Sequence, residues 1–227
     1  MTTVIHSITL LQVPPLGGGG GFWLFALASL MLNITPGNDM LYVATRSTSQ
    51  GIKAGIVSAL GIGVGCMVHI FAAVIGLSAL IAQSAVAFSI IKYIGAGYLI
   101  YLGVRSIISK TQAFNVAAKK EELSYSRMFW QGVVTNVLNP KVALFFLAFL
   151  PQFIDITAKH AWPQILFLGS WFDIGGTLIN ILVAVLFGKI GGWFSQSAWF
   201  QKWQNKVTGA ILIGLGIKVA AAKSQTL

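Results

Sequence analysis

The stretch Asn33-Ile34-Thr35-Pro36-Gly37-Asn38-Asp39 interrupts an apolar run from Phe22 to Ala44. A helix rises about 1.5 Å per residue, so about 20 residues cross a bilayer and this run is long enough to do so. Pro36 removes a backbone donor and Gly37 loosens the turn, so several peptide groups lose their helical partners. At membrane depth such a break, like the carboxylate of Asp39, is tolerated mainly inside a bundle or beside a wet cavity. The heptapeptide is therefore predicted to be a binding site.

The composition is that of an integral membrane protein. Of 227 residues, 56% are hydrophobic and 9% are charged, whereas about 25% are charged in a typical soluble domain. The 15 Lys and Arg residues stand singly at the ends of apolar segments, a pattern that sets membrane topology and does not form a nucleic-acid-binding face. The single cysteine, Cys66, permits neither an internal disulfide nor a CxxC motif.

Six apolar segments are predicted to be transmembrane helices. They cover residues 22–44, 54–81, 90–108, 128–154, 162–187 and 207–222. Residues 189–206 place aromatic side chains among lysines, which predicts an interfacial helix or an anchored loop. The single transporter domain is expected to span residues 22–222, between a flexible N-terminal extension (1–21) and a short C-terminal tail (223–227).

The positive charges predict the orientation of the chain. The connections after the first, third and fifth segments hold ten Lys and Arg residues, the opposite side holds four, and Lys141 lies inside the membrane. Cytoplasmic connections carry an excess of positive charge. Both termini are therefore predicted to lie outside the cytoplasm.

The two halves of the chain resemble each other. Residues 95–105 align without a gap with residues 208–218, so the third and sixth segments correspond. The first and fourth segments then correspond too, and each contains asparagine followed by proline, in Asn33-Ile-Thr-Pro36 and in Asn136-Val-Leu-Asn139-Pro140. Three spans per half force the halves to insert in opposite senses, as in many secondary transporters. The predicted fold is an all-α integral membrane protein with six transmembrane helices in two inverted three-helix repeats, the first and fourth helices being broken.

The two breaks supply the groups that a zwitterion needs. Asp39 is suited to hold an ammonium group or to carry a proton, and Lys141 to receive a carboxylate or to neutralise Asp39 in the empty site. Proton coupling is predicted at Asp39, His69 or Asp173, although His69 is also a plausible interhelical hydrogen bonder and Asp173 a solvated residue. The predicted substrate-binding residues are Asn33, Pro36, Gly37, Asn38, Asp39, Asn136, Asn139, Pro140 and Lys141. No cofactor and no metal site is expected.

The sequence resembles the LysE/RhtB family of amino-acid exporters over residues 22–218. The resemblance is carried by Thr35-Pro-Gly-Asn-Asp39, by residues 46–55 and 95–103, and above all by Asn139-Pro-Lys-Val-Ala-Leu-Phe-Phe-Leu-Ala-Phe-Leu-Pro-Gln-Phe153. It implies six spans in the inner membrane and efflux of homoserine, threonine, leucine or a basic amino acid, driven by the proton-motive force. Asn38 departs from the family, since many relatives have a second proline there, and the long N-terminus suggests a misassigned start codon.

Other functions are compatible with parts of the sequence. The glycine-rich helices and aromatic belt would also suit a non-transporting membrane scaffold. An electron carrier would need a thiol pair, and a metal exporter would need more soft ligands than one Cys and three His provide. No Ser-His-Asp, HExxH or Walker pattern supports an enzyme. The expected partners are the amino acid, protons, membrane lipid and a second copy of the chain, with sliding surfaces at Gly61, Gly65, Gly95, Gly97, Gly209 and Gly216.

Overall fold

The computed structural model describes residues 20–83, 85–108, 123–154, 161–190 and 198–221, and their regular structure is entirely helical. The elements are α2 (Gly20–Ile34), α3 (Asn38–Gln50), α4 (Ile52–Gln83), α5 (Ala85–Ile108), α6 (Tyr125–Val137), α7 (Pro140–Leu144), a π-helical turn η2 (Phe145–Phe149), a 3-10 turn η3 (Leu150–Phe153), α8 (Trp162–Ile190) and α9 (Ala198–Ala221). Of the predicted extension and tail, only Gly20 and Gly21 lie within the described residues, and both belong to α2.

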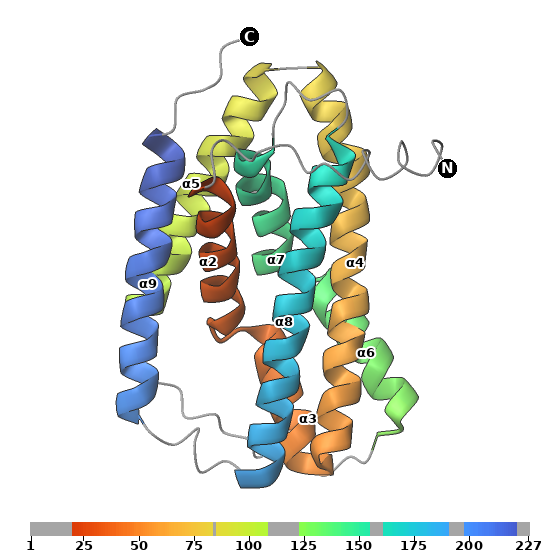
Figure 1. Cartoon of the computed structure of the whole chain (residues 1–227). Helices are drawn as coiled ribbons and strands as arrows, with labels where there is room; N and C mark the ends of the chain where they lie inside the picture. Colours follow the sequence, from red (N-terminus) through yellow and green to blue (C-terminus); the bar gives the residue numbers. More distant parts are fainter. Residues whose placement is uncertain (1–19, 84, 109–122, 155–160, 191–197, 222–227) are drawn as a thin grey trace, which may run out of the picture.

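Several helices have the length and apolar character of membrane spans. Within the described part of the chain, Ile52–Gly76 of α4 and Trp162–Lys189 of α8 each meet this requirement. A third candidate joins Tyr125–Val137 to Pro140–Phe153 with a bend of 44°, and shorter apolar helices cover Gly21–Ile34 and Tyr93–Ile108. The helices run up and down one bundle (Figure 1). The chain is therefore a multi-pass membrane protein.

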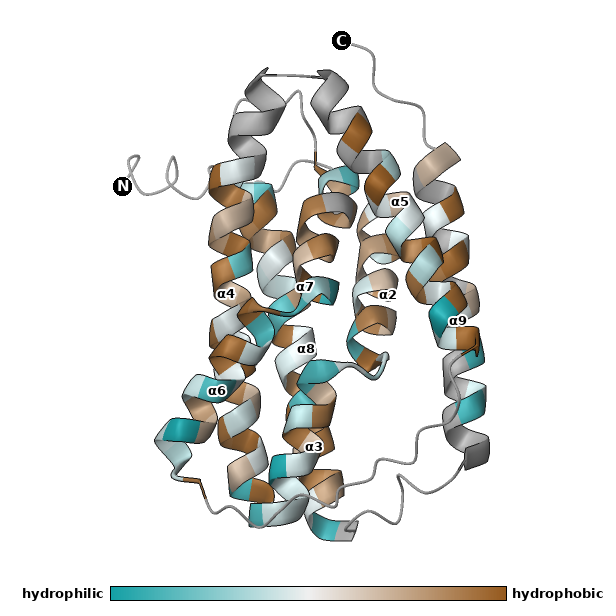
Figure 2. Ribbon diagram, turned by 180° about the vertical axis from the view of Figure 1, so that it is seen from behind, coloured by the Kyte–Doolittle hydropathy of each residue, from teal (hydrophilic) through white to brown (hydrophobic). Residues whose placement is uncertain are grey.

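Both predicted helix breaks are present. The chain leaves α2 after Ile34 and enters α3 at Asn38, and it leaves α6 after Val137 and enters α7 at Pro140. Hydrophilic residues appear at mid-height of the bundle around these two junctions, with mostly hydrophobic turns above them (Figure 2). The prediction that proline would interrupt two apolar segments is confirmed.

The two ends of the predicted interfacial stretch at residues 189–206 belong to longer helices. α8 continues to Ile190 and α9 begins at Ala198, nine residues before the predicted start of the last span. Neither proline nor glycine occurs between Ala198 and Thr208, so no residue in that stretch stops the helix. The remaining residues of the stretch, 191–197, lie outside the described part of the chain.

Glycine allows two pairs of helices to approach closely. A methyl group added at Gly61 of α4 would lie 2.2 Å from the backbone oxygen of Phe129 in α6. One turn along, a methyl group at Gly65 would lie 2.6 Å from Val133 O. Such contacts are typical of small residues at transmembrane helix interfaces. The prediction is wrong for Gly97, which is exposed and faces no atom within 4 Å.

The contacts between α5 and α9 come in matched pairs. A methyl group at Gly103 would lie 2.6 Å from Gly209 O, and one at Gly216 would lie 2.8 Å from Ala96 O. In the sequence alignment of the two halves, Gly103 corresponds to Gly216 and Ala96 to Gly209. The two contacts are therefore equivalent under exchange of the halves.

Buried aromatic rings fill the bundle between α2, η2, η3 and α8. We define the aromatic cluster as Phe25, Phe145, Phe149, Phe153 and Phe172. The rings of Phe145 and Phe172 stack with centroids 4.2 Å apart, and those of Phe149 and Phe153 are 4.8 Å apart. Phe25, Phe145, Phe149 and Phe172 are each at most 3% exposed. Four of the five rings belong to α2, η2 and η3, and α2 lies above the first helix break in the view of Figure 1.

Candidate functional site

The first break leaves a carbonyl oxygen without its helical donor. In a continuous helix Leu32 O would accept from the N–H of residue 36, but Pro36 has none. The ammonium of Lys141 replaces that donor: its Nζ lies 3.1 Å from Leu32 O and 3.1 Å from Thr35 O. A cation at the carboxyl end of a helix is also favoured by the helix dipole. Lys141 thus joins the start of α7 to the end of α2.

Gly37 provides the space for this ammonium. Its φ of −160° and ψ of −173° describe an extended backbone that any residue can adopt, so conformation does not require glycine there. A methyl group at this position would instead lie 3.2 Å from Lys141 Nζ and 3.6 Å from its Cε. A side chain at residue 37 would therefore crowd the ammonium, and glycine favours the close approach of the lysine.

The second break has an equivalent defect and a different solution. In a continuous helix Asn136 O would accept from the N–H of residue 140, which is Pro140; here the N–H of Asn139 donates to it at 2.9 Å. The ring nitrogen Nε2 of His69 in α4 lies 3.0 Å from Asn136 O. Because a carbonyl only accepts, Nε2 must carry the hydrogen in this contact. The His69 ring also stacks on Phe146, with centroids 6.1 Å apart.

A side chain caps the helix that follows the second break. Asn139 Oδ1 accepts from Lys141 N at 3.0 Å, and Pro140 occupies the first position of α7. Both are the preferred residue types at these positions, because the asparagine oxygen satisfies a free N–H and proline lacks one. The capping orients the lysine that follows, so the sequence Asn-Pro-Lys builds the break and its cation together.

Asp39 lies in the first turn of α3, where the positive end of the helix dipole favours a carboxylate. Its Oδ2 accepts from Asn136 Nδ2 at 2.9 Å. Asp39 is 9% exposed and Asn136 is 2% exposed. Three buried atoms beside this pair have no hydrogen-bond partner: Asp39 Oδ1, Asn136 Oδ1 and Asn139 Nδ2. Buried polar atoms without partners are costly and uncommon, so they indicate where a polar ligand belongs.

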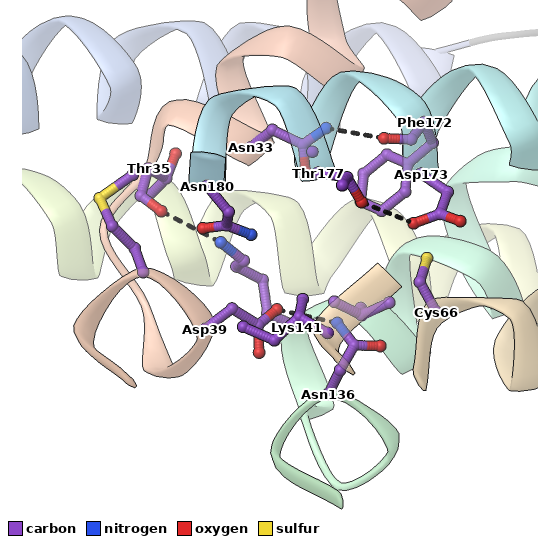
Figure 3. A pocket seen from close by; sticks show the side chains of 14 residues that line it. Asn33, Thr35, Asp39, Cys66, Asn136, Lys141, Phe172, Asp173, Thr177 and Asn180 are labelled. Atoms are coloured by element: carbon purple, nitrogen blue, oxygen red, sulfur yellow. Dashed lines mark hydrogen bonds between the residues drawn. The ribbon is translucent and has the colours of Figure 1, made fainter. Parts of the chain in front are cut away.

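A polar stripe of α8 faces this pair across the bundle. Asp173, Thr177 and Asn180 follow one another at helical spacing, and Thr177 Oγ1 lies 3.4 Å from Asp173 Oδ1. Asn33 of α2 joins the stripe, because its Nδ2 donates to Phe172 O at 3.1 Å. The thiol of Cys66, from α4, lies beside Asp173 (Figure 3).

These groups surround one small cavity at the level of the breaks. Its open volume is about 20 Å³, which holds about one water molecule, since one needs roughly 10–15 Å³. Asp39, Asn136 and Lys141 gather on one side of it, and Asp173, Thr177 and Cys66 lie on the other (Figure 3). The lining residues are Asn33, Thr35, Asp39, Met40, Ile62, Cys66, Asn136, Lys141, Val142, Phe172, Asp173, Gly176, Thr177 and Asn180.

The cavity brings together some of the residues predicted from the sequence and leaves others outside. Five of them line it: Asn33, Asp39, Asn136, Lys141 and Asp173. Pro36, Gly37, Asn139 and His69 adjoin these residues through the contacts described above, whereas Asn38 and Pro140 are exposed. In the described part of the chain no group of three or more His, Cys, Asp or Glu is placed to hold a metal ion.

Sequence reasoning included Thr35 in the predicted heptapeptide but not among the substrate-binding residues, and it missed Thr177 and Asn180. For the last two a signal existed, because Thr177 and Asn180 follow Asp173 at intervals of four and three residues. That spacing puts all three side chains on one face of a helix. The apolar lining residues, such as Ile62 and Val142, carry no comparable signal.

Polar contacts tie α3 to the start of α6 below the cavity. Tyr42 OH donates to Met128 O at 2.8 Å, and Arg46 donates to Gln131 Oε1 at 3.2 Å. One turn further, Gln50 Nε2 donates to the backbone oxygen of residue 123 at 3.0 Å. The three α3 residues are four apart and so share one face. The cavity is thus closed below by these contacts and above by the aromatic cluster.

Comparison with known proteins decides the family. The family model described as LysE type translocator matches residues 30–223. The chain belongs to this family. It is therefore a membrane translocator, which the resemblance in the sequence also predicted. No solved structure matches the chain.

The LysE-type translocator also has similar curated relatives. The membrane protein YrhP of Bacillus subtilis, whose function is uncharacterized, is 36% identical over 197 residues, or 83% of this chain and 92% of that protein. An uncharacterized membrane protein of Vibrio cholerae is 33% identical over 208 residues, 89% of this chain and 98% of its own. The leucine efflux protein of Salmonella typhimurium is 26% identical over 203 residues, 89% of this chain and 96% of that protein.

Proposed function

We propose that this LysE-type translocator is a secondary active exporter of small amino acids across the inner membrane, coupled to protons. The observation that carries the proposal is the cavity between two proline breaks, which offers an acidic group on one helix and a lysine on another. Family membership and a relative named as a leucine efflux protein support amino acids as the substrate class.

The substrate ammonium would bind at Asp39 and Asn136. Asp39 Oδ1 and Asn136 Oδ1 are buried acceptors without a donor, and an ammonium group brings three donors. Removing an acceptor of this kind from water without a partner is costly, so a cation there is strongly favoured. The neighbouring Asn139 Nδ2 is a donor without a partner, so it suits a carboxylate oxygen and not the ammonium.

The substrate carboxylate would bind at Lys141. Two of the three ammonium hydrogens are used on Leu32 O and Thr35 O, which leaves one for a ligand. The lysine lines the same cavity as Asp39, so the two charges can be satisfied together by one zwitterion. Charge-assisted contacts at both ends would account for selection of α-amino acids.

We further propose six spans arranged as two inverted repeats of three. The paired proline breaks and the equivalent contacts of Gly103 with Gly209 and of Gly216 with Ala96 support this plan. The end of α3 and the starts of α4 and α6 lie at the same end of the bundle as the end of α8 (Figure 1), and these segments carry Arg46, Lys53, Arg127 and Lys189. That end is assigned to the cytoplasm, so both termini lie on the opposite side.

Transport would require the cavity to open to each side in turn. About 20 Å³ does not accommodate an amino acid, so binding needs movement of the helices. On the cytoplasmic side the contacts of Tyr42, Arg46 and Gln50 with α6 would break. On the other side the rings of the aromatic cluster would move apart. Asp39 and Asp173 are the proposed proton carriers, and a homodimer remains a prediction.

The test uses the purified protein in liposomes with a pH gradient and labelled amino acids. We expect transport of at least one neutral or basic amino acid, stimulated by the gradient. Asp39→Asn should abolish it, because the substitution removes the charge at nearly the same shape. Lys206→Gln is the matched control: it also removes one charge, but at an exposed residue outside the cavity. Equal transport by both variants would reject Asp39 as the ammonium site, and no transport by the wild type across all standard amino acids would reject the exporter.

A further inference from the structure

We propose that α8 carries the subsite for the substrate side chain, and that it selects amino acids whose short side chain carries a hydroxyl or amino group. The subsite is formed by Asp173, Thr177 and Asn180. The inference rests on the proposed function, because it concerns the part of the same cavity that the zwitterion groups leave unused. It adds the substrate class and the residues that would set it.

The cavity has two chemically different sides. Asp39, Asn136 and Lys141 come from α3, α6 and α7 and match the ammonium and carboxylate that every α-amino acid carries. Asp173 and Thr177 of α8 lie across the cavity from Asp39 and Asn136 (Figure 3). An amino acid held by its two charges at the first side points its side chain away from them, toward α8. Discrimination among amino acids therefore depends on the α8 side.

The α8 stripe presents mainly acceptors. A carboxylate accepts at about four sites, whereas among the described residues Asp173 has two side-chain donors, Thr177 Oγ1 at the long distance of 3.4 Å and the weakly donating thiol of Cys66. Thr177 has a single hydroxyl hydrogen, and donating it to Asp173 leaves the threonine oxygen as an acceptor. Asn180, which is 7% exposed, adds an amide to the same face. A donor on the substrate side chain would complete these contacts.

An aliphatic side chain would be rejected by the same groups. It would remove water from Asp173 and Thr177 without replacing the lost hydrogen bonds. A site built to bond a hydroxyl or amino group rejects an analogue without one far more strongly than an apolar pocket rejects an added hydroxyl. Leucine, the amino acid in the name of the Salmonella typhimurium relative, is therefore expected to be a poor substrate of this chain.

The subsite is closely packed against α4 and α2. Gly63 of α4 lies so close to the stripe that an added methyl group would be 2.7 Å from Thr177 Oγ1 and 3.5 Å from Asp173 Oδ1. On the other flank, a methyl group at Gly176 would lie 2.9 Å from Asn33 Oδ1. Groups fixed by close packing discriminate better than mobile ones, because they cannot turn away from a poor ligand. The tight packing also favours short side chains over long ones.

The test measures exchange of labelled amino acids across liposomes that carry the full-length protein, with no pH gradient. Exchange needs no net proton movement, so it separates substrate choice from proton coupling. The probes are threonine and valine, which have nearly the same shape and differ by a hydroxyl in place of a methyl group. Homoserine and norvaline form a second pair. We expect the wild type to prefer the hydroxyl member of each pair at least about 10-fold in kcat/KM.

Thr177→Val should lower that ratio by about 10-fold while exchange of valine continues. Asp173→Asn is a second variant, and it should lower the same ratio without abolishing exchange. Thr48→Val is the matched control, because the Thr48 hydroxyl donates to Ala44 O within its own helix at 2.9 Å and lies outside the cavity. It should leave the ratio unchanged.

Three results would overturn the inference. One is a wild type whose kcat/KM for valine or leucine equals its kcat/KM for threonine. Another is a fall in kcat/KM by the same factor for both amino acids of a pair in Thr177→Val and Asp173→Asn, as expected if the stripe only carries protons. In both cases amino-acid exchange itself persists, so the proposed function stands. The third, complete absence of exchange for every amino acid in the wild type, rejects the proposed function together with the inference.

Discussion

Replacing Lys141 by methionine removes the donor that two carbonyl oxygens share at the end of α2. In the wild type Lys141 Nζ lies 3.1 Å from both Leu32 O and Thr35 O. The loss of Leu32's helical partner has a single cause, the missing N–H of Pro36. We therefore expect the cost of Lys141→Met to depend on whether residue 36 is proline.

The expected size of that dependence follows from counting carbonyls. A buried acceptor that loses its donor costs about 1–3 kcal/mol, so Lys141→Met in the wild type carries that penalty twice. In a Pro36→Ala background the new N–H at residue 36 can donate to Leu32 O, and only Thr35 O is left without a partner. The two substitutions should therefore be coupled by about 1–3 kcal/mol, the penalty of one carbonyl.

The measurement is a double-mutant cycle on reversible unfolding of the purified protein in detergent micelles. Pro163→Ala is the matched control, because Pro163 lies in the first turn of α8, where the missing N–H has no helical partner to lose. It should show no coupling to Lys141→Met. If Lys141→Met costs the same in the wild-type and Pro36→Ala backgrounds, within about 0.5 kcal/mol, the lysine does not act as the substitute donor.

Substitutions at Gly61 and His69, each with a control variant, test the packing around the cavity. Gly61→Ala would place a methyl group 2.2 Å from Phe129 O and should lower the melting temperature, whereas Gly97→Ala, with no atom within 4 Å, should leave it unchanged or raise it; similar melting temperatures would contradict the close contact of α4 and α6. His69→Phe removes one of the two donors to Asn136 O, which keeps the N–H of Asn139, and should cost about 0.5–1.5 kcal/mol of unfolding free energy. His69→Gln retains a donor, so an equally large loss for both His69 variants would count against that hydrogen bond.

The sequence alone predicted the membrane class, the two breaks and the main apolar segments. These features are local: hydrophobic runs determine the spans, and the missing N–H of Pro36 and Pro140 interrupts a helix wherever it occurs. The capping asparagine and the lysine that follows are also readable from Asn139-Pro-Lys. The early start of α9 was missed because the interfacial pattern of aromatic residues and lysines was given more weight than the absence of a helix breaker.

The tertiary structure alone decided which groups satisfy the broken backbone. Lys141 was predicted to bind substrate or neutralise Asp39, and His69 to carry protons or to make an interhelical hydrogen bond. The structure places Lys141 on Leu32 O and Thr35 O, and His69 on Asn136 O. These contacts join residues 67 to 109 positions apart. A proline determines that an acceptor loses its donor, but the identity of the new donor depends on which helix packs within reach, and that is a property of the whole bundle.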